Sequence, residues 1–195
     1  LEANFIQNVQ VPTMQFHPNT VQLRTTTPLG PVRLAASPTG LAGVWFEGQR
    51  HEPGLQLHGP AAWPQAPGHA LLQEAAQQLQ QYLAGQRAGF DLPLDLSGGT
   101  PFQQAVWRAL LAIGRGATTS YGALSRQLGR PLAVRAVGAA VGRNPISVVV
   151  PCHRVVGANG SLTGYAGGLD RKTALLRLEN AVPSTSDNFP PQGSA

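Results

Sequence analysis

The sequence predicts an α+β protein in which a small antiparallel sheet with one helix precedes a mainly helical part of the winged-helix or helix-turn-helix type. Three observations lead to this prediction. Three short β-prone segments, separated by turn residues, open the chain. One glutamine-rich amphipathic segment follows them. Three further helical segments then succeed one another within residues 100–143.

The length of 195 residues is enough for one large domain or two small ones with a hydrophobic core. We expect an N-terminal extension over residues 1–19, an N-terminal structural domain with its linker over residues 20–96, and a second domain over residues 97–181. Residues 182–195 are rich in proline and serine, and we expect them to form a disordered tail.

The first half of the chain is predicted to be structural. Its expected strands are "TVQLRTT", "PVRLAAS" and "LAGVWFEG", which the turn sequences "TPLGP" and "SPTG" separate. The segment "HALLQEAAQQLQQYLAG" has apolar residues at 72, 76, 79 and 83 and is predicted to be a helix that ends at Gly85. Asp91 and Asp95 flank Pro93 in an extended segment, and we interpret them as solvated carboxylates.

The second half opens with a helix-start pattern. Thr100 is predicted as the N-cap, with Pro101 at the first helical position and Gln103 completing a capping box. A second helix is expected after Ser120 and ends at Gly129, and a third follows almost at once. Two short helices joined by a glycine-containing turn are typical of a helix-turn-helix.

The third helix of this half has two distinct faces. The face predicted to pack against the core carries Val134, Val137 and Val141. A second face carries one cation followed by residues with almost no side chain, namely Arg135, Gly138, Ala139 and Gly142. Such a face suits close packing against another helix, and it equally suits close approach to the backbone of a binding partner.

Charge is distributed unevenly along the chain. Residues 1–96 carry four arginines and six acidic residues, a net charge of −2, whereas residues 97–181 carry ten cations and two acidic residues, a net charge of +8. With Asp187 the total is +5. Positive charge concentrated in one half favours a polyanionic partner, but it does not by itself distinguish nucleic acid from a membrane surface. No apolar run approaches the ~18 residues of a membrane span, so a membrane protein is not expected.

The chain has one cysteine, Cys152, which excludes an internal disulfide and a cysteine-based zinc cluster. The other metal-binding candidates, His51, His58 and His69, are scattered, so no metal site is predicted. The first residues, "LEANFIQNVQ", lack the basic and apolar regions of a secretory signal. We therefore expect a cytoplasmic protein, associated with the nucleoid if bacterial, in which the thiol stays reduced.

The surroundings of Cys152 suggest an activated thiol rather than a small buried hydrophobe. The run "VVVPC" is predicted to be a buried strand that ends at the sulfur. Neighbours on a strand point to opposite faces, so His153 can act as a base only if the chain turns there or a water bridges the two groups. The segment "DRKTALLRLENA" is predicted to be a helix that brings Glu179 close. A carboxylate that orients a histidine, which deprotonates a cysteine, is a general route to thiol activation.

The motifs "PCHRVVG", "GYAGGLDRK" and "PFQQAVWRALLAIGRGATTSYGALS" resemble those of the O6-alkylguanine-DNA alkyltransferases, also called methylated-DNA–protein-cysteine methyltransferases. The resemblance is dense from about residue 90 to residue 181 and looser over residues 20–85. It implies a ribonuclease H-like N-terminal domain and direct-reversal DNA repair. The protein would flip O6-alkylguanine out of duplex DNA and transfer the alkyl group irreversibly to Cys152, in a single turnover and without a cofactor. Activity on O4-alkylthymine is left open.

The resemblance also implies roles for individual residues. Cys152 is the acceptor, His153 is a water-bridged base that Glu179 orients, and Asn144 is a hinge beside them. The residues expected to bind DNA are Tyr121, Arg130, Arg135, Gly138 and Ala139, with Arg135 filling the gap left by the flipped base. The expected substrate pocket consists of the Val155 carbonyl, the Tyr165 ring and the Ala166 N–H, which faces O6. The expected partner is double-stranded DNA approached from the minor groove by a monomer.

Two alternative functions remain from the residues alone. A thiol hydrolase could use Cys152, His153 and Glu179, but it would leave the basic helix-turn-helix without a purpose. A redox-sensing helix-turn-helix regulator could use Cys152 as an exposed sensor, but the valine-rich approach favours a buried thiol.

Overall fold

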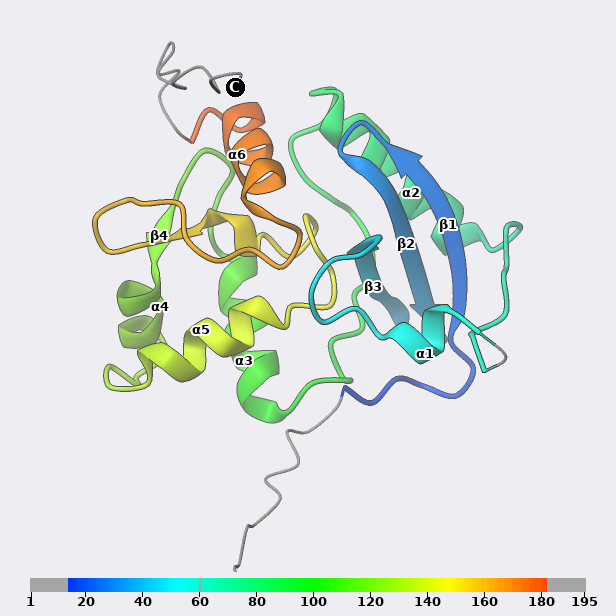
Figure 1. Cartoon of the computed structure of the whole chain (residues 1–195), viewed down its shortest axis with the longest axis horizontal. Helices are drawn as coiled ribbons and strands as arrows, with labels where there is room; N and C mark the ends of the chain where they lie inside the picture. The colour runs from blue at the N-terminus through cyan, green and yellow to red at the C-terminus, as the bar shows by residue number, and fades with distance from the viewer. Residues whose placement is uncertain (1–13, 60, 182–195) are drawn as a thin grey trace, which may run out of the picture.

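A computed structural model describes residues 14–59 and 61–181. The expected disordered tail, 182–195, and the first thirteen residues of the expected N-terminal extension lie outside the described residues. Figure 1 shows a sheet with its covering helix on one side of the molecule and a group of helices on the other. Within the described residues, no helix is long and apolar enough to cross a membrane.

The sheet has three antiparallel strands in the order β1–β2–β3. These are β1 (Val21–Thr27), β2 (Gly30–Ser37) and β3 (Gly40–Phe46), each within two residues of its predicted position. The turn between β1 and β2 ends at Gly30, whose φ of 108° favours glycine. The predicted antiparallel sheet is confirmed.

Helix α2 (Ala70–Leu83) covers one face of this sheet (Figure 1). Its buried side is formed by Leu72, Ala75, Gln78, Leu79 and Tyr82. The chain leaves the helix through Gly85, whose φ is 74°, as the C-cap pattern predicts. The opposite face of the sheet packs against a separate aromatic cluster that contains Phe16, Trp45 and Trp63, next to the short helix α1 (Gly54–Leu57).

The C-terminal half contains the predicted helices. They are α3 (Pro101–Leu111), α4 (Tyr121–Gln127), α5 (Val134–Gly142) and α6 (Leu169–Leu178). The capping box of α3 is confirmed, because the Gln103 N–H donates to the Thr100 hydroxyl at 3.3 Å and the Thr100 N–H donates to the Gln103 side chain at 2.9 Å. Two short parallel strands, β4 (Thr119–Ser120) and β5 (Val155–Val156), pair beside α4.

Helix α5 packs on α3, and one predicted core residue is wrong. Val137 and Val141 are buried, but Val134 is 39% exposed. The Trp107 indole N–H of α3 donates to the Ala140 carbonyl at 2.8 Å, which places the contact in the second half of α5. Val134 is the first residue of the helix and lies beyond that contact, so its side chain stays in solvent.

The predicted strand before Cys152 is also wrong. Ile146 makes one isolated parallel bridge to Val44, and residues 147–150 then follow tight turns, with Val148 at a φ of 73°. The Asn144 side chain supplies the bonds that a neighbouring strand would supply: it accepts from the Ile146 N–H at 3.0 Å and donates to the Val150 carbonyl at 2.8 Å. These local bonds override the β-propensity of the valines. The segment is nevertheless buried, as expected.

The outer edge of β3 joins the two halves of the molecule. The Val44 N–H donates to the Pro145 carbonyl at 2.9 Å, and the Leu41 N–H donates to the Pro93 carbonyl at 2.8 Å. The linker is held further by Asp95, which accepts from the Ser37 hydroxyl at 2.5 Å. Burial raises the pKa of Asp95, but hydrogen bonds from Ser37 and Ser97 outweigh it and lower that pKa to about 2. Asp95 is therefore a structural carboxylate, not the solvated one that the sequence suggested.

Candidate active site

Cys152 opens a single 3₁₀ turn, Cys152–Arg154, immediately after the buried segment. The residue is 4% exposed. The Asn144 amide donates to its sulfur at 3.1 Å while also donating to the Val150 carbonyl. Asn144 is itself buried, so one side chain fixes both the approach of the chain and the position of the thiol.

The 3₁₀ turn places the His153 side chain against Glu179 at the C-terminal end of α6. The His153 Nε2 atom lies 2.5 Å from Glu179 Oε1, and both side chains are fully buried. The second ring nitrogen, Nδ1, is buried and has no hydrogen-bond partner among the described residues. The ring therefore has one nitrogen committed to the carboxylate and one left for another group.

Glu179 caps the C-terminus of α6, where it accepts from three side chains. Besides His153, the Arg154 Nε donates to Oε2 at 2.8 Å and the Tyr82 hydroxyl donates to Oε1. Burial raises the pKa of Glu179, but hydrogen bonds from His153 and Arg154 outweigh it and lower that pKa to about 2. Glu179 is thus a fixed anion at neutral pH.

Burial raises the pKa of the Cys152 thiol, although the Asn144 hydrogen bond and the nearby Lys172 charge lower it. Burial also lowers the pKa of His153, against the opposite effect of Glu179. The resting site therefore holds a neutral thiol near a neutral imidazole rather than a preformed thiolate. A buried, protonated cysteine is also a poor redox sensor, which counts against the regulator hypothesis.

Sequence reasoning missed three buried polar residues of this site. Tyr82 comes from α2 in the N-terminal half, which the sequence suggested was purely structural. Arg154 bridges Glu179 to the carbonyl of Ile113, two residues after the end of α3. Lys172, the only lysine of the chain, is fully buried. A lone lysine within the apolar pattern of a helix was the one signal that could have been read in advance.

The Lys172 ammonium holds the segment that surrounds the thiol. It donates to the Val155 carbonyl at 2.6 Å and to the Thr163 carbonyl at 2.7 Å. Burial lowers its pKa to about 8. These bonds tie α6 to both β5 and the loop that carries Tyr165, so Lys172 fixes two walls of the site relative to each other.

A cavity of about 260 Å³ opens next to Tyr165 and Ala166. It brings together five of the predicted residues, Tyr121, Gly138, Ala139, Tyr165 and Ala166. Burial raises the pKa values of the Tyr121 and Tyr165 hydroxyls, and a charge on Cys152 would raise both further, so the thiol is close to both tyrosines. The volume of the cavity is slightly below the ~300–1,000 Å³ of typical small-molecule sites.

The predicted pocket residue Val155 lies on the buried side of the site. Its carbonyl already accepts one bond from Lys172, and its N–H donates to the Cys152 carbonyl. Each carbonyl oxygen has two lone pairs, so the Cys152 and Val155 carbonyls each have one lone pair that these bonds do not use.

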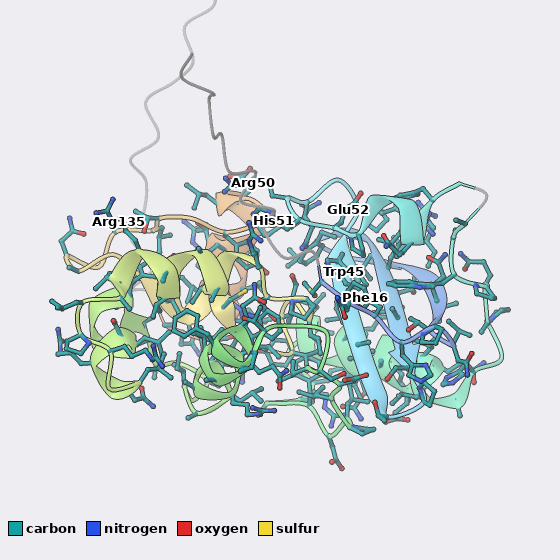
Figure 2. All side chains as sticks on the ribbon, turned by 90° about the horizontal axis from the view of Figure 1, so that it is seen from below. Phe16, Trp45, Arg50, His51, Glu52 and Arg135 are labelled. Carbon is teal, nitrogen blue, oxygen red and sulfur yellow. The ribbon has the colours of Figure 1, made fainter. Side chains whose placement is uncertain are left out.

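Two arginines were predicted to bind DNA, and they point to different places. Arg135 is exposed on the first turn of α5, and Figure 2 shows it at the edge of the molecule. The Arg130 guanidinium instead lies 5.7 Å from the centroid of the Phe102 ring on α3. Arg130 is therefore not part of the small-residue face of α5.

Comparison with known proteins identifies the family. Residues 24–96 match the ribonuclease-like domain of 6-O-methylguanine DNA methyltransferase, and residues 101–181 match its DNA binding domain. Among curated proteins, the methylated-DNA–protein-cysteine methyltransferase of Mycobacterium tuberculosis is 48% identical over 155 residues, which is 80% of this chain and 89% of that protein. The Methanosarcina acetivorans protein of the same name is 45% identical over 156 residues, covering 80% and 95% of the two chains.

Solved structures agree with the sequence comparison. The crystal structure of Mycobacterium tuberculosis OGT in complex with DNA superposes with a TM-score of 0.72 at 45% identity, covering 82% of this chain and 92% of that one. The Methanococcus jannaschii O6-methylguanine DNA methyltransferase, at 24% identity and a TM-score of 0.56, shares the fold, with 88% and 99% of the two chains covered. Because both domain matches are present and together span most of the sequence, the chain belongs to the 6-O-methylguanine DNA methyltransferase family.

Proposed function

We propose that this protein repairs DNA by direct reversal, transferring the alkyl group of O6-alkylguanine irreversibly to Cys152. The observation that carries the proposal is the arrangement of Asn144, Cys152, His153 and Glu179 beside a helix-turn-helix in a member of this family. All of these groups come from one chain, so a monomer is sufficient.

Glu179, His153 and a bridging water would form a proton relay to Cys152, and this relay explains how a neutral thiol becomes a nucleophile. In this proposal a water molecule links the unpartnered Nδ1 of His153 to the Cys152 sulfur. His153 accepts the thiol proton through that water, and the Glu179 anion stabilises the imidazolium that forms. The Asn144 amide stays on the sulfur and stabilises the thiolate as its charge develops.

The transfer itself is a displacement at the alkyl carbon. A lone pair of the Cys152 thiolate forms the S–C bond while the C–O6 bond breaks, and the released electron pair passes to the guanine. The guanine then takes up one proton, which leaves unmodified guanine and a thioether. Since the relay has no group that cleaves a thioether, the protein acts once.

The cavity beside α5 supplies the substrate contacts in this proposal. Tyr165 forms the wall against which the base packs, and the Ala166 N–H faces O6. The free lone pairs of the Cys152 and Val155 carbonyls receive the guanine amino group. This arrangement accepts a base only after it has left the helical stack, because O6 inside a duplex is not open to in-line attack.

DNA lies along α5 in this proposal, in the minor groove. Gly138 and Ala139 have almost no side chain, so the helix backbone can approach the duplex closely. Arg135, on the same face, enters the stack and fills the gap left by the flipped nucleotide. The cytoplasm is the compartment that fits this chemistry, because it provides both DNA and reducing conditions.

Label transfer tests the proposal directly. Incubation with duplex DNA that carries a radiolabelled methyl group on O6 should move the label to the protein. Cys152→Ser should bind the same duplex and acquire no label, because a serine hydroxyl is hardly ionised near neutral pH. Substantial label on the Cys152→Ser protein would refute the assignment of the acceptor.

A further inference from the structure

The loop that joins β3 to α1 reaches from the N-terminal sheet to the substrate cavity. Two of its residues, Arg50 and His51, line that cavity together with residues of α5. The Arg50 backbone N–H donates to the Ala166 carbonyl at 3.1 Å, which ties the loop to the rim of the cavity. A part of the N-terminal domain therefore lies at the opening through which the proposed substrate reaches the site.

This loop has a defined conformation. The side chain of Gln49, which is 6% exposed, accepts from the Phe46 N–H at 2.9 Å and from the Ser147 hydroxyl at 3.3 Å. The next residue but one, His51, has a φ of 65°. Left-handed backbone outside glycine is uncommon, although histidine adopts it more readily than most residues, and it persists only where the surroundings fix it. The Gln49 side chain and the bond from the Arg50 N–H to Ala166 hold the chain immediately before His51.

The loop adds positive charge to the face that α5 presents. Figure 2 shows Arg50 and His51 side by side along the same edge of the molecule as Arg135. Arg143, at the C-cap of α5, also lines the cavity. The loop also has two acidic residues, and both have partners away from the cavity. Glu47 pairs with Arg24 at 2.6 Å. Glu52 accepts from the Gly48 N–H at 3.2 Å and lies 3.5 Å from His58. Within the described residues Arg50 forms no ion pair, so its charge is available to a ligand.

The two side chains differ in what they offer. Arg50 presents a permanent charge with several donors, which suits a phosphate oxygen pair. Burial lowers the pKa of His51, and the neighbouring Arg143 and Arg50 charges lower it further. Above neutral pH His51 is therefore an uncharged hydrogen-bond donor. A nucleotide turned into the cavity brings its own backbone phosphates past this rim.

We propose that Arg50 and His51 bind a backbone phosphate of the DNA beside the flipped nucleotide, so that the ribonuclease-like domain takes part in DNA binding. The inference rests on the proposed function, because it uses the same cavity and the same duplex. It assigns the contact to the β3–α1 loop of the N-terminal domain, whereas the DNA-binding residues expected from the sequence all lie in the C-terminal half.

The test measures the affinity of the Cys152→Ser protein for a duplex with one O6-methylguanine, at pH 8 and several salt concentrations. Adding Arg50→Gln should weaken binding about three- to tenfold and reduce the slope of log affinity against log salt by about 0.9, the value for one lost phosphate contact. Adding His51→Asn, which tolerates the left-handed backbone, should weaken binding without changing the slope, because a neutral donor releases no counterion.

Arg24→Gln is the matched control. It removes the same charge from the same domain, but Arg24 lies on the outer strand β1 and its side chain pairs with Glu47 at 2.6 Å. Its affinity and salt slope should equal those of the parent. The melting temperature of Arg50→Gln should also equal that of the parent, because the bond to Ala166 comes from the backbone.

Two results would overturn the inference while leaving the proposed function intact. One is an Arg50→Gln protein whose affinity and salt slope equal those of Arg24→Gln, while the wild-type protein still transfers the methyl group to Cys152. The other is a lower melting temperature with an unchanged slope, which would make Arg50 a brace between the domains. Failure of the wild-type protein to transfer methyl would overturn the proposed function instead, whereas a slope loss in Arg50→Gln would still support the phosphate contact.

Discussion

At the scale of single residues, the site depends on one buried carboxylate that three donors hold. Tyr82, His153 and Arg154 all reach Glu179, and they come from two separate parts of the chain, helix α2 and the 3₁₀ turn that begins at Cys152. Because the folded pKa of Glu179 is about 2, below its ordinary value of 4.5, this network stabilises the fold above pH 4.5. That contribution is lost as the pH falls from 4.5 toward 2, where Glu179 takes up a proton.

Changes to this network should slow transfer in a graded order. His153→Ala removes the proposed base and should cost about 10²- to 10⁴-fold in rate. Glu179→Gln keeps the shape of the side chain but weakens the proposed base, so the transfer rate should fall less than in His153→Ala. Tyr82→Phe keeps the ring packing and removes one hydrogen-bond donor to the carboxylate, so the transfer rate should fall least in this variant.

Single-turnover rates across pH check this order. The profiles of His153→Ala and Glu179→Gln should move to higher pH, because a weakened base leaves more of the deprotonation to solvent. Affinity for DNA should change little, since the proposed roles of these residues concern the thiol and not the duplex. Rates and profiles that stay at wild-type values in both variants would remove the relay from the mechanism.

At the scale of elements, α5 contains a glycine that lowers its stability and leaves one position of the helix without a side chain. Gly138 lies within the helix, where glycine costs roughly 1 kcal/mol relative to alanine. An added Cβ would meet Tyr121 at 3.7 Å, which is an ordinary contact, so the fold itself does not require glycine there. The absence of a side chain at this position therefore needs a reason outside the folded chain, and close approach to DNA provides one.

Gly138→Ala should separate the two effects. The free energy of unfolding should rise by about 0.5–1 kcal/mol. Affinity for duplex DNA should fall, because the added methyl group lies on the face proposed to approach the groove. Thermal unfolding and duplex binding on one preparation give both quantities. A stabilised protein with unchanged affinity would show that this face does not contact DNA closely.

Arg135→Ala should distinguish duplex from free-base activity. Arg135 is exposed, so its loss should leave the fold intact. In its proposed role Arg135 offsets the unstacking cost of a few kcal/mol, so repair of duplex O6-methylguanine should slow by about ten- to a thousand-fold without it. Transfer from free O6-benzylguanine, if the cavity admits it, should be nearly unchanged. An equal fall in both activities would assign Arg135 to the fold or the pocket.

The same scale shows what local sequence patterns encode. The strands, the capping box at Thr100 and the glycine that ends α2 follow from periodicity and turn chemistry, which act over a few residues. The valine run before Cys152 misled the prediction, because the Asn144 side chain supplies competing hydrogen bonds that no propensity includes. The prediction that Val134 is buried was wrong because helical spacing does not show how far along α5 the contact with a neighbouring helix extends.

At the scale of the whole molecule, the parts that escaped prediction depend on how the two domains meet. Tyr82 reaches Glu179 across 97 residues of sequence, and Arg50 meets Ala166 across a similar separation. No local pattern encodes such docking. The motifs around Cys152 were sufficient to identify the family, whereas the contributions of the N-terminal domain to the site became visible only in the folded chain.

The most direct test of the account is a titration of the protein with increasing duplex O6-methylguanine, followed by intact-mass and peptide mass spectrometry. The account predicts that methylation stops at one methyl group per protein, however much substrate is present, and that the methyl group lies on the peptide that contains Cys152. Repaired DNA that continues to accumulate beyond one equivalent, or a methyl group on any other peptide, would contradict it.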